Sequence, residues 1–100
     1  MQKTIELTKE KIQEVIETFD KKEIAKGYAK VSEVAGYLLD LNQKIVEALG
    51  NGRLLEYNMN HFMEILNDLM SALTEKDSVL ISDILQYDML EELERLEKCL

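Results

Sequence analysis

Proline is absent from this sequence of 100 residues, and glycine occurs only four times. Sandwiches and barrels of β-strands need many turn residues, so these two shortages favour an all-helical chain. Cysteine occurs once, at Cys99, which excludes a disulfide within the chain. The uninterrupted apolar runs reach only two or three residues, which is too short for a membrane-spanning helix.

Charge is plentiful but unevenly distributed. The net charge is −8, and residues 51–100 hold four basic residues against eleven acids. Duplex DNA and anionic lipid would both be repelled by this half, so we expect no nucleic-acid and no membrane partner. The first residues are too polar for a signal peptide, which leads us to expect a cytoplasmic protein.

Two apolar seams organise residues 54–100, which contain neither glycine nor proline. Residues spaced by three and four share one helix face. The first seam consists of Leu55, Met59, Phe62, Leu66, Leu69 and Leu73, and the second of Ile81, Leu85, Met89, Leu93, Leu96 and Leu100. A short break at residues 74–77, with Asp77 or Ser78 as the cap, predicts an antiparallel helical hairpin.

The first fifty residues predict two further helices. Residues 2–7 suit either a short extended arm or an early helix start, and Thr8 can cap a helix that buries Ile12, Val15, Ile16 and Phe19. We expect this helix to end at Asp20, because Asp20 and Glu23 have capping-box spacing and Phe19 and Ile24 have that of a hydrophobic staple. Gly50 suits the left-handed position after the second helix.

The second helix carries a longer seam and two internal glycines. Its seam consists of Ile24, Tyr28, Val31, Ala35, Leu38, Asn42, Ile45 and Leu49. Gly27 and Gly36 each cost about 1 kcal/mol relative to alanine. Either another helix crosses closely at these glycines, or the fold simply tolerates them.

These patterns together predict one all-α domain, an antiparallel four-helix bundle with a short first helix. The expected helices cover residues of about 9–19, 21–49, 53–74 and 78–99.

Catalytic and metal-binding chemistry find no support in the sequence. His61 is the only histidine, and Glu64 lies one turn on, but one histidine cannot build a carboxylate-bridged di-iron site. We therefore interpret His61 as a surface residue. No phosphate-binding glycine loop and no spaced Cys/His set is present, so we expect no enzyme, no cofactor and no metal.

A polar interruption in the last helix is the first candidate for a partner-binding site. Asp83 and Tyr87 lie one turn apart, and Asp88 falls in the register of the seam. Tyr87 could instead bury its ring and bond an acid or amide of a facing helix, such as Asn42. Cation binding is a third option, although no metal-loop spacing accompanies these acids.

Met63 and Met70 form the second candidate. They lie seven residues apart in the row beside the first seam. Methionine is adaptable and common on promiscuous binding surfaces. The alternative is that both belong to a broad core stripe.

The segment Asp77–Leu90 resembles small uncharacterised acidic helical proteins of Gram-positive bacteria. In those proteins a Val-Leu-Ile/Leu-x-Asp-Ile/Leu-Leu-x-Tyr-acid-Leu stretch opens the last helix, and a Lys-Gly-Tyr triplet is similar to residues 26–28 here. They often carry a proline after the tyrosine, which this chain lacks. In size and acidic helical character the chain is also similar to flagellar export chaperones.

Three functions compete at this point. The leading hypothesis is a non-enzymatic cytoplasmic protein–protein interaction module, such as a small chaperone or regulator. The second is a homodimeric assembly element, joined mainly through the first two helices because their half carries a net charge of only about −1. The third is a bundle that binds a small molecule or metal.

Overall fold

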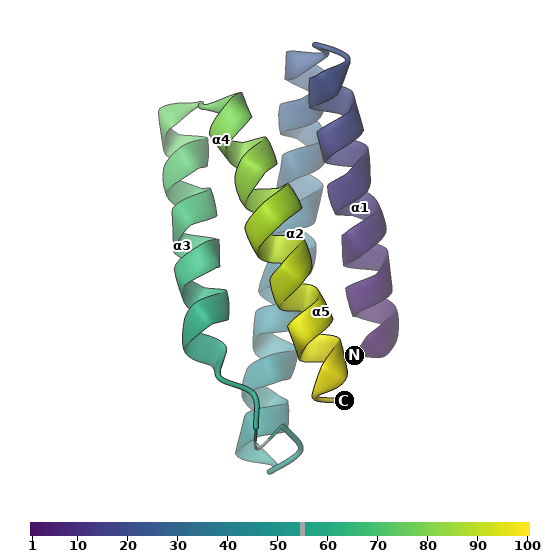
Figure 1. The fold of residues 1–100 in the computed structure, drawn as a ribbon, viewed down its shortest axis with the longest axis vertical. Helices are drawn as coiled ribbons and strands as arrows, with labels where there is room; N and C mark the ends of the chain where they lie inside the picture. Colours follow the sequence, from purple (N-terminus) through teal and green to yellow (C-terminus); the bar gives the residue numbers. More distant parts are fainter. Residues whose placement is uncertain (55) are drawn as a thin grey trace.

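The computed structural model describes residues 1–54 and 56–100, and this part of the chain is helical and contains no strand (Figure 1). Three long segments lead the chain, α1 (Gln2–Asp20), α2 (Ile24–Gly50) and α3 (Met59–Glu75). The fourth is continuous but composite: α4 (Ser78–Asp83), the π-helix η1 (Ile84–Met89) and α5 (Leu90–Lys98). No helix among these is both long and apolar enough to cross a membrane.

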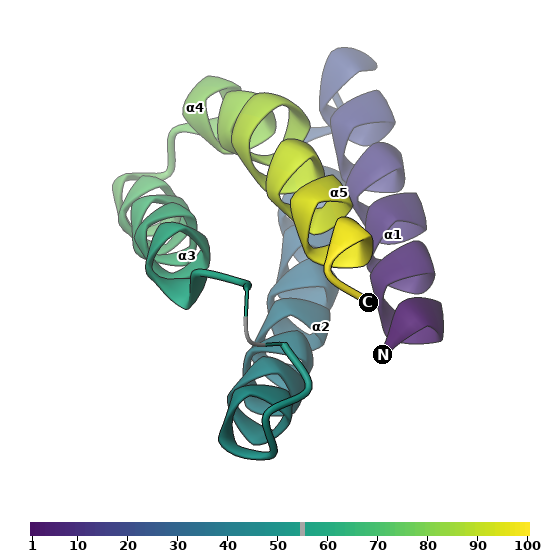
Figure 2. The same ribbon diagram turned by 60° about the horizontal axis from the view of Figure 1, so that its bottom comes forward.

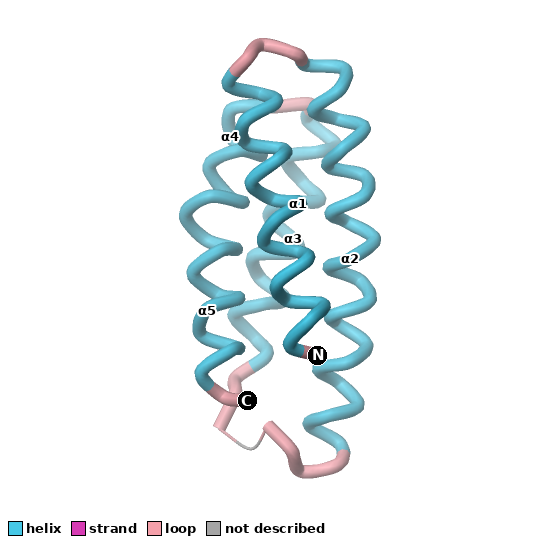
Figure 3. Tube along the Cα trace, turned by 90° about the vertical axis from the view of Figure 1, so that its right-hand side faces the viewer, coloured by secondary structure: helices cyan, strands magenta, loops and turns pink. Residues whose placement is uncertain are grey.

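The composite last helix lies between α3 and α1 (Figures 1 and 2). It contacts α3 through α4 and η1, and it contacts α1 through all three of its parts. α2 lies alongside α1 over most of its length (Figure 3). Both ends of the chain lie towards the same end of the molecule, next to the end of α5 (Figure 1).

α1 begins at Gln2, which confirms the early helix start, so the extended arm and the short first helix are both wrong. The expected buried face is confirmed, since Ile12, Val15, Ile16 and Phe19 are all buried. Ile5 and Thr8 are also buried and add two turns to the same face. The burial of Ile5 against the core stabilises the first turns of this helix. A strand at the same residues would have no partner strand.

The break between α1 and α2 is real, but its cause is not the capping box that the sequence suggested. Asp20 is the last residue of α1, and Glu23 occupies the N-cap of α2 without a side-chain hydrogen bond. Lys22 instead adopts a left-handed conformation with φ of 65°. The amide of Glu23 donates to the carbonyl of Thr18 and that of Lys22 to Phe19, which is the Schellman pattern.

Two later helix ends repeat this motif. Gly52 has φ of 74°, and the amides of Arg53 and Gly52 donate to the carbonyls of Ala48 and Leu49. The end of α3 is closed in the same way around Lys76, which has φ of 54°. Gly50 is therefore not the left-handed residue that we expected; α2 extends through it and the reversal occurs two residues later.

Side-chain caps start the last two helical segments. Asp77 caps α4 as expected, and its carboxylate accepts from the amide of Leu80 at 3.0 Å. Asn58 caps α3, and its side-chain oxygen accepts from the amide of Asn60 at 3.0 Å. α3 thus begins several residues after the expected start near residue 53, because residues 51–54 and 56 form turns before it.

The predicted seams identify much of the core. Met59 and Leu73 are partly buried, and the other described positions of both hairpin seams apart from Leu100 are buried: Phe62, Leu66, Leu69, Ile81, Leu85, Met89, Leu93 and Leu96. Leu100 is 54% exposed and lies past the end of α5, so its place in the seam is wrong. Leu55 lies outside the described residues. On α2 the buried stripe is turned towards Val34, Leu41 and Ala48, which leaves Ile24 at 43% exposure.

Another helix crosses closely at Gly27 but not at Gly36. A Cβ atom added to Gly27 would overlap the ring of Phe19 on α1, so only glycine fits there without movement. The ring of Phe19 also meets Tyr28 edge to face, with centroids 5.5 Å apart. Gly36 has no neighbouring atom within 4 Å of an added Cβ, so packing does not require a glycine at that position.

Candidate interaction site

The π-helix η1 places the polar residues that the sequence singled out. In a regular α-helix, Asp88 would lie about 20° short of two full turns from Ile81 and would face the core, whereas Met89 would lie about 80° past two full turns. In the structure Met89 is fully buried and Asp88 is exposed. A π-helical turn contains more residues than an α-helical turn, so Ile81, Leu85 and Met89, which are four residues apart, all face the core. The carboxylate of Asp88 is thereby kept out of the core.

This shift creates an exposed surface on the last helix, which we name the outer α4–η1 face and define by Val79, Leu80, Asp83, Tyr87 and Asp88. All five are exposed, with Val79 at 71%, Tyr87 at 63% and Leu80 at 40%. The buried-ring interpretation of Tyr87 is therefore wrong. π-Helical turns are rare and are often found at functional sites.

Asn42 does not meet Tyr87, although the sequence placed it in a seam. Its Oδ1 atom is shielded from solvent and has no hydrogen-bond partner in the part of the chain that the structure describes. The side chain as a whole is partly buried. We find no role for this orphaned oxygen in the candidate site.

Two hollows flank the outer α4–η1 face. The hollow towards α1 measures about 270 Å³ and is lined by Phe19, Asp20, Lys22, Ile24, Ser78, Val79, Ser82, Asp83 and Gln86. The hollow towards α3 also measures about 270 Å³ and is lined by Asp68, Ser71, Ala72, Glu75, Leu80, Ile84 and Asp88. Asp83 and Asp88 thus open onto opposite sides of the same helix.

Met63 and Met70 differ in their burial and in their distance from the outer α4–η1 face. Met70 is partly buried and lines a shallow depression on α3 together with Ser71 and Glu75, which also line the hollow towards η1. Met70 therefore adjoins the outer α4–η1 face. Met63 is 37% exposed, lies two turns earlier on α3 and lines none of these depressions.

A polar cluster elsewhere escaped the sequence reasoning. Glu92 on α5 is fully buried, and its Oε2 accepts a 2.6 Å hydrogen bond from the hydroxyl of Tyr57. Its Oε1 lies 2.6 Å from Nη1 of Arg95 and 2.8 Å from Nδ1 of His61. Tyr57 belongs to the connection between α2 and α3, so the cluster ties that connection to α5.

The donors in this cluster follow from chemistry. Arginine can only donate, and a carboxylate can only accept, so Nδ1 of His61 must carry its hydrogen to bond Glu92. Nη1 of Arg95 lies 2.9 Å from the same Nδ1, and both groups then point their hydrogens at one oxygen. Burial raises the pKa of Tyr57, and the hydrogen bond to Glu92 raises it further, so the phenol remains a donor.

The surface interpretation of His61 is thus only half of its role, because its side chain is 52% exposed yet reaches a buried carboxylate. One signal in the sequence could have revealed Glu92. It lies three residues after Met89 and four before Leu96, at the spacing of core residues, and a carboxylate there requires partners. Arg95, one turn on, is the partner that the sequence offers.

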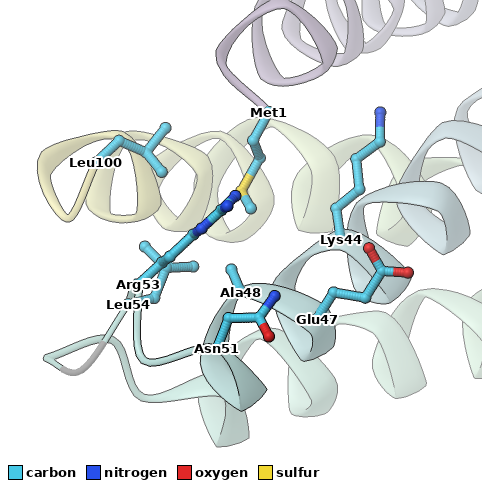
Figure 4. Close-up of a pocket in the computed structure, with 8 residues that line it drawn as sticks. All are labelled: Met1, Lys44, Glu47, Ala48, Asn51, Arg53, Leu54 and Leu100. Carbon is cyan, nitrogen blue, oxygen red and sulfur yellow. The ribbon is translucent and has the colours of Figure 1, made fainter.

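A further hollow lies at the end of the molecule where the two termini meet (Figure 4). It measures about 450 Å³ and is lined by Met1, Lys44, Glu47, Ala48, Asn51, Arg53, Leu54 and Leu100. Arg53 extends across it towards Met1 (Figure 4). Lys44 is already engaged, because its ammonium lies 2.8 Å from the Thr4 hydroxyl and 3.1 Å from Asp40.

Metal ligands do not gather anywhere in the described residues: no group of three or more His, Cys, Asp or Glu side chains is arranged to hold an ion. The buried carboxylate of Glu92 has both oxygens occupied by protein donors. The structure thus contains a buried polar cluster around Glu92 and an exposed apolar and acidic surface on the last helix.

The fold defines an all-helical protein in the part of the chain that the structure describes. The chain belongs to the family described as a domain of unknown function, DUF8042, which matches residues 1–99. No curated protein and no solved structure matches it.

Proposed function

We propose that the chain is a non-enzymatic protein–protein interaction module built as an antiparallel four-helix bundle. It acts in the cytoplasm as a small chaperone or regulator and binds its partner through the outer α4–η1 face.

The exposure of Tyr87 carries this proposal. An aromatic side chain that is 63% exposed leaves a large apolar surface in water, and tyrosine is enriched among the residues that dominate binding energy. Tyr87 lies in a π-helical turn, and the apolar side chains of Val79 and Leu80 are exposed on the preceding turns. Exposed apolar side chains that gather on one part of a surface tend to mark an interface.

Substitution of Tyr87 tests the proposal directly. A tagged chain is used to capture partners from lysate of the native host, as wild type, as Tyr87→Ala and as the control Val46→Ala. Val46 is 53% exposed on α2, away from the outer α4–η1 face. The captured protein is then purified and titrated against each variant by calorimetry.

We expect Tyr87→Ala to weaken binding by about 2 kcal/mol, roughly thirtyfold, which is the size of an interface hot spot. Val46→Ala should bind as the wild type does. Loss of binding in Val46→Ala, with normal binding in Tyr87→Ala, would move the interface to α2 and refute the proposed surface.

A homodimeric assembly element is the second candidate, and α2 favours it. Leu39 and Val46 lie seven residues apart on one face of α2 and are each 53% exposed. Leu7 on α1 adds a further exposed apolar side chain at 38%. Sedimentation equilibrium at tens of micromolar should then give about twice the chain mass of 11.6 kDa. A monomer at that concentration would exclude this candidate.

A further inference from the structure

The hollow between α3 and η1 combines an apolar floor with an acidic rim, and we name it the acidic hollow. Ala72 and Ile84 are buried in its floor, and Leu80 reaches its surface at 40% exposure. Asp68 and Glu75 of α3 line one wall, and Asp88 of η1 lines the other. The π-helix is what turns Asp88 outwards to this wall, because a regular helix would point it at the core.

No cation neutralises this rim within the residues that the structure describes. The side chains of Asp68, Glu75 and Asp88 take part in none of the ion pairs or hydrogen bonds found there, and no Lys, Arg or His lines the hollow. Some acids on other elements are paired, such as Glu14 with Lys11 and Lys30. Lys76 follows Glu75 in the chain and is exposed, but it does not line the hollow.

We propose that the acidic hollow binds a basic amphipathic helix of the partner protein. This inference rests on the proposed function and names the chemistry of its partner. Charge complementarity selects Lys or Arg opposite the three carboxylates, and the apolar floor selects an aliphatic or aromatic side chain between them.

The spacing of the rim sets the pattern of the partner helix. Asp68 and Glu75 are two turns apart, about 10 Å along α3. A partner helix lying along α3 meets them with basic residues at positions i and i+7. An apolar residue at i+3 or i+4 then enters the hollow against Leu80 and Ile84, and a third basic residue on the neighbouring row meets Asp88.

A designed peptide tests this pattern without knowledge of the natural partner. The probe is a fluorescein-labelled, alanine-rich helix of about 18 residues with Lys at i and i+7, a third Lys on the neighbouring row to meet Asp88, and Leu at i+3 and i+4. Its control has the same composition in scrambled order, so charge and hydrophobicity are matched. Binding to the full chain is measured by fluorescence anisotropy at physiological salt. Ordered binding at least several-fold tighter than that of the scrambled peptide supports the proposal, and equal binding overturns it.

Two charge-matched variants locate the binding surface. One carries Asp68→Asn, Glu75→Gln and Asp88→Asn, and the other carries Glu6→Gln, Glu10→Gln and Glu17→Gln, which are exposed acids on α1. Each variant loses three negative charges. The first should weaken binding about tenfold through the loss of three exposed ion pairs, and the second by less than about twofold. Equal weakening would show general charge attraction and overturn the assignment to the hollow.

The floor is tested by Leu80→Ser against Leu39→Ser, two exposed leucines on different helices. Loss of binding in the first alone supports the apolar contact, whereas loss in the second alone overturns it. Failure of the peptide to bind, alongside Tyr87-dependent capture of a natural partner, overturns only the basic-helix inference. Peptide binding without any Tyr87-dependent partner refutes the proposed function instead.

Discussion

The hydrogen bond between Tyr57 and Glu92 offers the sharpest test of how this fold is stabilised. The substitution Tyr57→Phe removes one hydroxyl and leaves the ring in place. Oε2 of the fully buried Glu92 then loses its donor, while Arg95 and His61 still serve Oε1. A buried charged acceptor that loses one hydrogen bond costs about 1.5–3 kcal/mol. For a domain of this size, that corresponds to a fall in Tm of about 6–24 °C.

Urea unfolding followed by circular dichroism measures this loss. Tyr37→Phe is the control for the same chemical change, because Tyr37 is partly buried and its hydroxyl bonds no other described residue. The control should change stability by less than about 0.5 kcal/mol. Equal effects of the two substitutions would show that the Tyr57 hydroxyl contributes nothing specific. A double-mutant cycle with Glu92→Gln should show coupling of about 1 kcal/mol or more, and simple additivity would contradict the pairing.

The same bond makes stability depend on alkaline pH. Burial first, and Glu92 second, raise the pKa of Tyr57 in the folded protein above the ordinary value of 10.0. The protonated phenol therefore stabilises the fold fully below about pH 10, and this contribution is lost as the pH rises from there towards the folded-state pKa. Tyr57→Phe should flatten the decline in stability above pH 10, and a decline identical to that of the wild type would refute this account.

The remaining predictions concern packing and helix ends, and each is measured by urea or thermal unfolding. Gly27→Ala should destabilise the chain because its Cβ would overlap the Phe19 ring, whereas Gly36→Ala should stabilise it by about 0.5–1 kcal/mol; the same sign for both would contradict the packing. Lys22→Gly should relieve a left-handed lysine and stabilise by up to about 1 kcal/mol, and clear destabilisation would refute the strain. Phe62→Ala should cost about 3–5 kcal/mol because the ring is fully buried, and a change in Tm of under about one degree would place it outside the core.

Much of the helical content follows from the sequence, because spacing by three and four decides which residues can share a buried face. Phe62, Leu69 and Leu85 were identified in this way. The ends of the helices were predicted less accurately from the sequence. Lysines occupy the left-handed positions at residues 22 and 76, where only glycine or asparagine would be expected, so the local chemistry gave no sign of these two turns.

The candidate site was predictable in its residues but not in its form. Asp83, Tyr87 and Asp88 interrupt an apolar helix, which marked them out. Their exposure depends on a π-helical turn, which the spacing of four between Ile81, Leu85 and Met89 favours but does not by itself require. The acidic hollow depends on how α3 packs against η1. A sequence pattern does not report which residues of these two helices face each other.

The polar cluster around Glu92 could not be predicted from the sequence for a different reason. A glutamate at core spacing is ambiguous until its partners are known, and Tyr57 lies 35 residues away in an irregular connection. Contacts of this kind depend on the path of the chain between helices. That path follows from the tertiary packing and has no periodic signal.

The most direct measurement is a map of the bound surface by amide chemical shifts. ¹⁵N-labelled chain is titrated with the captured partner. The proposed function predicts that the largest changes cluster in residues 79–88 of the last helix and residues 68–75 of α3, with little change in α2. A cluster of changes on α2 between Leu39 and Val46, with residues 79–88 unaffected, would contradict the claim that the outer α4–η1 face binds the partner.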